Sequence, residues 1–173
     1  PNPSETLLSQ RARGAGGSVV FCTLQGSRPI LCDLQALAAK SFYSVPKRTV
    51  GGMDSSRVAL LLAVMEKRAG KKLFDQDVYI NVAGGLALSD PAADLAVCVA
   101  VASSLMGFAL SPSLSVMGEV GLCGEVRPVS QAERRVAECV RLGFTEILLP
   151  KQNMKSIKPI EGVRLTGVDT LMQ

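Results

Sequence analysis

Residues 90–107 read DPAADLAVCVAVASSLMG, and after Asp94 the segment is apolar around nearly its whole circumference. Asp90 or Pro91 is expected to open a helix, because acidic residues and proline both favour a first helical turn. A helix without a polar face is typical of a position between other layers of a domain. The apolar part is too short to span a bilayer. The segment therefore predicts a buried central helix.

The segments on either side of this helix predict strands and two further helices. Two strands joined by a turn at residues 25–27 are expected to form a β-hairpin. Asp54 and Gly70 mark the two ends of one helix, and Ser130, with Glu133 at the capping-box position, is expected to cap another. Residues 40–52 are expected to form a basic loop, and strands are expected at residues 18–24, 28–37, 78–83, 114–117, 124–127, 147–149 and 163–167. The order ββ-α-β-α-ββ-α-β-β predicts one α+β domain with a mixed sheet and packed helices.

The composition of the chain fits one compact domain. Of its 173 residues, 47% are apolar and 20% are charged, which is enough to bury a core and excludes a disordered chain. Its net charge of +4 permits binding to a polyanion without requiring it. We expect residues 1–17, which are polar and rich in glycine, to be a flexible linker from a missing domain, and residues 18–173 to be the folded domain. No signal peptide is visible, so a soluble, intracellular protein is expected.

The residue types exclude several classes of site. The chain has no histidine, which excludes a Ser-His-Asp triad, a Cys-His dyad and a histidine-ligated metal. Its five cysteines form no C-x-x-C pair, so we expect buried free thiols in a reducing compartment. No glycine-rich segment continues into the Lys-Ser/Thr of a nucleotide-binding loop. Asp90 and Asp94 are interpreted as groups that stabilise a helix start rather than as metal ligands.

Three segments carry a family resemblance. They are DPAADLA at residues 90–96, GEVGLCGEVRPV at residues 118–129 and LGFTEILLPKQN at residues 142–153. From about Arg57 to the C-terminus, this pattern resembles the proteolytic domain of Lon-type proteases. In that family the central helix opens with Gly-Pro-Ser-Ala-Gly, whose serine is the nucleophile, and a lysine on a later helix is its base. The resemblance implies the Lon proteolytic-domain fold, which is also named after the second domain of a small-subunit ribosomal protein.

The same resemblance implies that the chain is not a peptidase. It places Ala92 at the position of the nucleophile and Arg135 at the position of the base. Alanine has no nucleophilic atom, and arginine stays protonated and cannot act as a general base. Asp94 stands where the family has glycine, and we expect it to disturb an oxyanion site. No catalytic residue is therefore assigned to this chain.

The N-terminal half narrows the resemblance further. PSETLLSQRARGAGGSVV at residues 3–20, GSRPILCDLQAL at residues 26–37 and GGMDSSRVALLLAVMEKRAG at residues 51–70 resemble the C-terminal domain of RadA (Sms) DNA repair proteins. That family implies a homohexameric ring that serves as scaffold for a DNA-dependent ATPase and promotes branch migration in recombination. It implies ATP, magnesium and zinc for the missing domains and no cofactor for this chain. The implied partners are further copies of the chain, single-stranded or branched DNA and a recombinase filament, with no membrane, in the bacterial cytoplasm or a eukaryotic organelle.

Two groups of basic residues are candidates for DNA contact. They are Lys40, Lys47, Arg48 and Arg57, and then Lys67, Arg68, Lys71 and Lys72. From composition alone, each group is equally well explained as a DNA-binding surface or as a solvated basic face. The resemblance favours Lys47, Arg48 and Arg57 as DNA-binding residues, since phosphate contacts need only positive side chains. Phe42 and Tyr43 are the only aromatic side chains in this region that suggest base stacking.

Two alternatives stay open at this point. The first is an active serine peptidase with a relocated dyad that uses Ser89, although the sequence has no lysine between residues 73 and 150. The second is an oligomerisation module that does not contact DNA. A peptidase assay separates the first alternative from the leading hypothesis, and DNA retention by the assembled protein separates the second.

Overall fold

The computed structural model of the chain describes residues 16–83 and 86–172. The strands are β1 (Ser18–Gln25), β2 (Arg28–Lys40), β3 (Arg48–Gly51), β4 (Gln76–Val82), β5 (Leu114–Val116), β6 (Glu119–Val120), β7 (Val126–Arg127), β8 (Glu146–Pro150) and β9 (Arg164–Val168). The helices are α2 (Ser55–Ala69), α3 (Asp94–Met106) and α4 (Ala132–Arg141), with short 3-10 helices η2 (Pro91–Ala93) and η3 (Lys151–Ser156). Most of the linker expected at residues 1–17 lies outside the described residues, so its character stays a prediction.

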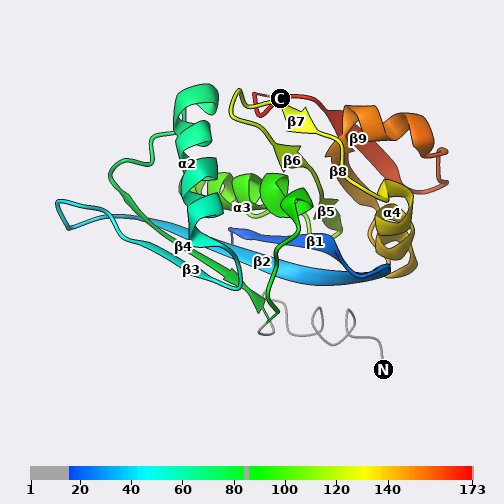
Figure 1. The fold of residues 1–173 in the computed structure, drawn as a ribbon, viewed down its shortest axis with the longest axis horizontal. Helices are drawn as coiled ribbons and strands as arrows, with labels where there is room; N and C mark the ends of the chain where they lie inside the picture. The colour runs from blue at the N-terminus through cyan, green and yellow to red at the C-terminus, as the bar shows by residue number, and fades with distance from the viewer. Residues whose placement is uncertain (1–15, 84–85, 173) are drawn as a thin grey trace.

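The main sheet is mixed, as the sequence predicts. Its strand order is β3-β4-β2-β1-β5-β8-β9. Strand β2 pairs antiparallel with β1 and β4, and the other neighbouring strands pair in parallel. Strands β6 and β7 form a separate antiparallel pair. Figure 1 shows the sheet running along the length of the molecule, with α2 and α3 on one side of it.

Helices α3 and α4 cover opposite faces of strand β1. The side chain of Thr23 donates a hydrogen bond to Asp90, just ahead of η2 and α3. The free thiol of the preceding residue, Cys22, lies instead beside the free thiol of Cys139 of α4. Because successive side chains of a strand point to opposite faces, the two helices lie on opposite sides of β1. The central helix is therefore buried in the layered domain that its lack of a polar face predicts.

The hairpin and the first long helix form where local signals place them. Strands β1 and β2 pair from Ser18↔Gln35 to Gln25↔Arg28, with Gly26 at a φ of 63° in the tight turn. The backbone N–H of Ser56 donates to the Asp54 side chain at 3.0 Å, so Asp54 caps α2 as predicted. Gly70 ends this helix in the left-handed conformation, with a φ of 67°.

The GEVG segment lies directly against the start of the central helix. The N–H of Gly118 donates to the Ala92 carbonyl, and the N–H of Leu95 donates to the Gly118 carbonyl, both at 2.9 Å. A Cβ at Gly118 would lie only 3.1 Å from the Leu95 Cβ and 3.0 Å from the Val126 Cγ1. Glycine at this position therefore allows the strand to approach the helix and fixes the backbone around Ala92.

Two local predictions are wrong. Residues 40–52 are not all loop, because Arg48–Gly51 form the edge strand β3 beside β4. Ser130 does not cap α4: the cap residue is Gln131, which has no side-chain cap bond, while the Ser130 carbonyl and hydroxyl accept bonds from Arg135. The central helix opens at Pro91 as predicted, and its first turn is a 3-10 helix, η2, which Asp90 caps through a bond from the Ala92 N–H.

Candidate functional site

Asp90 is the point at which three separate segments meet. One carboxylate oxygen accepts the Ala92 N–H at 3.0 Å. The other accepts the hydroxyl of Thr23 at 3.3 Å and a guanidinium N–H of Arg135 at 2.7 Å. Strand β1, the start of the central helix and α4 are thereby connected. The capping role predicted for Asp90 is confirmed, and its ion pair is an additional finding.

Arg135 is completely buried, and its donors are occupied. Besides Asp90, its guanidinium donates to the carbonyl of Cys22 and, through Nε, to the carbonyl of Ser130, both at 2.8 Å. Its Cζ also lies 5.9 Å from the centroid of the Phe21 ring. A guanidinium stays protonated at physiological pH and accepts no hydrogen bond. Arg135 therefore stabilises the fold at this point and has no means of removing a proton from a nucleophile.

Positions 92 and 135 lie against the same carboxylate, although they are far apart in the sequence. Ala92 is 3% exposed and contributes only a methyl group here. Its backbone N–H and the Arg135 guanidinium both bind Asp90. The resemblance to Lon-type domains placed the nucleophile and base at these two positions, and the structure brings them together. The chemical groups needed for that reaction are absent from both side chains.

Asp94, which is buried, forms a second ion pair one turn further along, with the partly exposed Arg57. Its carboxylate binds both the Nε and an Nη of Arg57, the Nε at 3.0 Å, and accepts the Val120 N–H at 3.1 Å. The bond to Asp94 raises the pKa of Arg57 above its ordinary value. Asp94 thus connects α2, α3 and the short β6 strand. This position, which holds glycine in the proteases that the sequence resembles, has a structural role in this chain.

A polar hollow of about 440 Å³ opens beside Asp90. Its walls come from the β1–β2 turn, the loop before η2 and the turn before α4. Ser89, the candidate for a relocated nucleophile, lies in this wall together with Ser130 and Gln131. The described residues that line the hollow include no lysine. Ser89 therefore has space beside it for a ligand but lacks the neutral amine that would activate it.

The three residues predicted to bind DNA lie in different environments. Lys47 is exposed, and its ammonium group lies 4.3 Å from the centroid of the Tyr43 ring. The guanidinium of Arg48 donates to the carbonyls of Leu73 and Gln76, and Arg57 is paired with Asp94. Arg48 and Arg57 are therefore not the free surface charges that the sequence argument assumed. Of the three, Lys47 is best placed to contact a phosphate.

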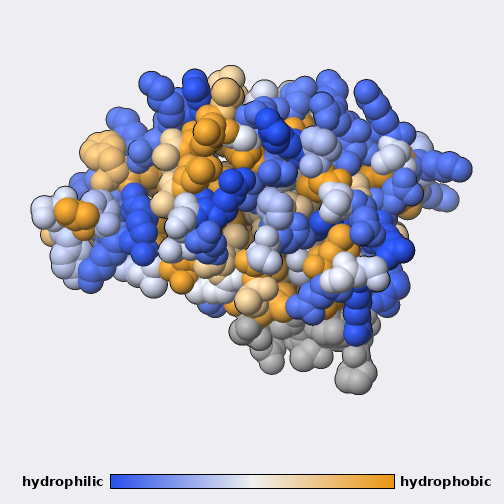
Figure 2. All heavy atoms as spheres, viewed as in Figure 1, coloured by the Kyte–Doolittle hydropathy of each residue, from blue (hydrophilic) through white to orange (hydrophobic). Residues whose placement is uncertain are grey.

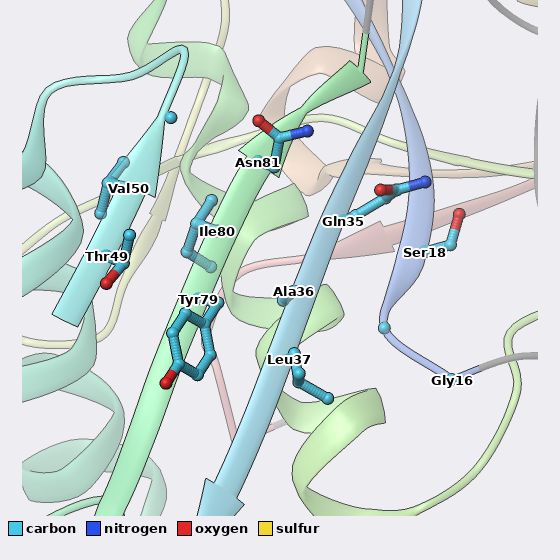
Figure 3. A pocket seen from close by; sticks show the side chains of 12 residues that line it. Gly16, Ser18, Gln35, Ala36, Leu37, Thr49, Val50, Tyr79, Ile80 and Asn81 are labelled. Carbon is cyan, nitrogen blue, oxygen red and sulfur yellow. The ribbon is translucent and has the colours of Figure 1, made fainter. Parts of the chain in front are cut away.

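A second hollow, of about 540 Å³, lies on the exposed face of strands β2, β3 and β4. Leu37 and Tyr79 pair directly across β2 and β4, and both side chains are exposed. Figure 3 shows them on adjacent strands, with Gln35 and Asn81 further along the same strands. None of the lining residues is charged. This face lacks the cations that a phosphate backbone requires, and its apolar character suits a protein contact.

Neither a metal site nor a membrane-spanning helix is found in the part of the chain that the structure describes. Within residues 16–83 and 86–172, no three histidine, cysteine, aspartate or glutamate side chains come together as metal ligands. No helix in these ranges is both long enough and apolar enough to cross a bilayer. All five cysteines are free; four are buried and Cys123 is exposed.

Known proteins are similar to this chain in sequence. Residues 54–168 match the family described as Lon protease (S16) C-terminal proteolytic domain. The chain is 44% identical over 172 residues to the DNA repair protein RadA of Streptococcus pyogenes serotype M3, covering 99% of this chain and 38% of that protein. The RadA proteins of Streptococcus pneumoniae and Bacillus subtilis are each 43% identical, over 99% and 96% of this chain and 41% and 36% of their own lengths. The chain thus spans about two fifths of the length of these relatives.

Proposed function

Because this chain belongs to the family of Lon protease C-terminal proteolytic domains and is similar to RadA DNA repair proteins, we propose that it is a proteolytically inactive Lon-like domain that assembles a ring and contacts DNA. The observation that supports the proposed inactivity is the geometry around Asp90, whereas the ring and the DNA contact are proposed from the similarity to RadA proteins. The resemblance gives the positions of nucleophile and base to Ala92, which offers a methyl group, and to Arg135, whose guanidinium is bound to Asp90 and to two backbone carbonyls. The site supports structure and not proton transfer.

The proposed DNA contact is the basic loop between β2 and β3, together with the cations beside it. Lys47 and Lys40 provide exposed ammonium groups at the two ends of the loop. Arg48 adds positive potential while its guanidinium holds backbone carbonyls, and Arg57 contributes less because Asp94 compensates its charge. In a ring, copies of this loop from all subunits would act on one polyanion, so weak single contacts would add up.

The proposed assembly is a hexamer, as the family resemblance implies. We assign its contacts to the exposed β2–β3–β4 face with Leu37 and Tyr79, to the sheet edges β3 and β9, and to the surface of α4 that carries Arg134 and Arg141. Light scattering on the chain at high micromolar concentration should give the mass of six copies. A stable monomer under these conditions would contradict the assembly.

The wider role that we propose concerns the protein of which this chain would be a part. It would work in the interior of the cell, with branched or single-stranded DNA and a recombinase filament as partners. ATP, magnesium and zinc would belong to its other domains, and the ATPase would promote branch migration on a ring formed by this domain. We also propose that the domain has the fold named after the second domain of a small-subunit ribosomal protein.

A peptidase assay on an unstructured protein substrate tests the inactive site. The parent chain should not hydrolyse the substrate, and Ser89→Ala should leave the result unchanged. The double variant Ala92→Ser with Arg135→Lys should also stay inactive, because Asp90 remains to pair with the new lysine and Asp94 still holds Val120 and Arg57. Hydrolysis that disappears in Ser89→Ala would establish the relocated dyad and contradict the proposal.

A further inference from the structure

The loop between β2 and β3, residues 41–47, carries three of the most exposed apolar or aromatic side chains in the described structure. Phe42 is 96% exposed, Val45 76% and Tyr43 57%. Residues of these types are mostly buried in folded proteins, and contiguous exposed groups of them mark interaction sites. Figure 2 shows a small orange group among pale and blue spheres at the left end of the molecule, where Figure 1 places this loop.

Both ends of the loop are fixed to the neighbouring segment, residues 73–78. The N–H of Ser41 donates to the Asp75 carbonyl at 2.8 Å, and the N–H of Lys47 donates to the buried Asp77 carboxylate at 2.6 Å. The guanidinium of Arg48 then binds the carbonyls of Leu73 and Gln76. Because its base is held in this way, the loop presents its side chains with little additional loss of conformational entropy on binding.

Positive charge surrounds the exposed rings. The Lys47 ammonium lies over the Tyr43 ring at 4.3 Å, and Lys40 and Arg48 flank the loop in the sequence. The contacts with residues 73–78 also bring the second basic group of the sequence close, since Lys72 directly precedes that segment. Phe74, which is 68% exposed, adds another ring there. The acidic side chains of the segment that holds the loop are Asp75 and Asp77, of which Asp77 is buried and accepts the Lys47 N–H, and Glu66 accepts the Leu73 N–H.

We propose that this loop binds single-stranded DNA by stacking unpaired bases on Phe42 and Tyr43 while Lys40 and Lys47 hold the adjacent phosphates. This inference rests on the proposed DNA contact and adds the strand type and the binding mode. Aromatic side chains interleaved with cations are the usual combination in proteins that bind single strands without sequence preference. A duplex offers its phosphates to the same lysines, but its bases are already stacked on each other and cannot lie on the rings.

Phe42→Trp gives a direct reporter, because the chain contains no tryptophan. The parent side chain is almost fully exposed, so the substitution should not disturb the fold. Addition of a thymidine oligomer of about 20 nucleotides should quench the new fluorescence. The same oligomer made entirely of abasic sites should leave it unchanged. Equal changes in fluorescence with both oligomers would overturn base stacking. A blue shift of the tryptophan emission caused by raising the protein concentration alone would also overturn it, because it would place the loop in a contact between subunits.

Affinity measurements separate this inference from the proposed function. Phe42→Ala with Tyr43→Ala should weaken binding to the thymidine oligomer about fivefold or more and leave duplex binding unchanged. Leu122→Ala, which removes another exposed apolar side chain on a distant turn, is the matched control and should change neither affinity. Lys40→Ala with Lys47→Ala should weaken both affinities. If only the lysine variant loses binding, stacking is wrong and the DNA contact stands; if the parent binds no DNA, both are wrong.

Discussion

Arg57 and Arg135 each form an ion pair with an aspartate that is distant in the sequence, by 37 and 45 residues respectively. Both aspartates flank the 3-10 turn that carries Ala92. The turn is therefore bounded by two carboxylates, each bound by a guanidinium group. These ion pairs stabilise the segment to which the resemblance assigns the nucleophile of Lon-type peptidases.

Asp94→Ala tests this structural role. The change leaves Arg57 without its carboxylate and the buried Val120 N–H without an acceptor, so the free energy of unfolding should fall by about 3 kcal/mol. Urea unfolding followed by circular dichroism measures this value. Arg164→Ala, which breaks an exposed ion pair with Glu146, is the control and should cost less than about 1 kcal/mol. Equal losses in the two variants would contradict the role of Asp94.

The buried thiols predict a loss of stability at alkaline pH. Burial raises the pKa of Cys32 and of Cys98 to about 12, from an ordinary value of 9.0. Above pH 9 the unfolded chain therefore releases these protons while the folded chain keeps them, and the free energy of unfolding should decrease as the pH rises. Urea unfolding at a series of pH values should show a shallower decrease for Cys98→Ala. Cys123→Ala, which removes the exposed thiol, should leave the pH dependence of the parent unchanged.

At the scale of single elements, the sequence predicts well where the signal is local. The hairpin turn, the Asp54 cap and the Gly70 end of α2 are set by residues within one turn of each other, and the structure confirms them. Strand β3 was missed because it has only four residues, follows Pro46 and takes its partner, β4, from beyond α2. Edge strands with proline and lysine beside them resemble loops in a single sequence.

The start of α4 shows why the sequence did not predict the remaining contacts of the candidate site. A serine followed three residues later by glutamate is a sound capping signal. Arg135, however, takes both oxygen atoms of Ser130, because its guanidinium must satisfy its donors beside Asp90. The two ion pairs at the candidate site depend in the same way on residues that only the fold brings together. The resemblance identified positions 92 and 135, but not what surrounds them.

The backbone conformation at the N-terminus of α4 suggests a substitution that should stabilise the fold. Gln131 is the one non-glycine residue in the described part of the chain with a positive φ, of 50°. Gln131→Gly should relieve the strain of the left-handed conformation and raise the free energy of unfolding by about 0.5–1 kcal/mol. The urea midpoint measures the gain. Gln152→Gly, at an exposed position inside η3, is the control and should be neutral or destabilising. A lower midpoint for Gln131→Gly would show that this conformation is not strained.

At the scale of the whole molecule, the loop proposed to contact DNA lies apart from the candidate site around Asp90 and Arg135. The basic, aromatic loop extends from one end of the sheet, whereas Asp90 and Arg135 lie near the β1–β2 turn at the other end of strand β2 (Figure 1). The uncharged hollow over Leu37 and Tyr79 is on the open face of the sheet. The proposed inactivity and the proposed DNA contact therefore concern separate parts of the molecule and can be tested with separate variants.

The salt dependence of DNA binding tests the central claim most directly. Dissociation constants for a fluorescent single-stranded oligomer should be measured between low and moderate salt for the parent, for Lys40→Ala with Lys47→Ala, and for the control Lys155→Ala with Lys158→Ala, whose lysines are also exposed. The parent and the control should bind with the same steep salt dependence. The loop variant should bind more weakly, with a slope of log K against log salt that is smaller by roughly 0.7 for each lost phosphate contact. Identical affinities and slopes for all three proteins, at an unchanged assembly mass, would contradict the claim that this loop contacts DNA.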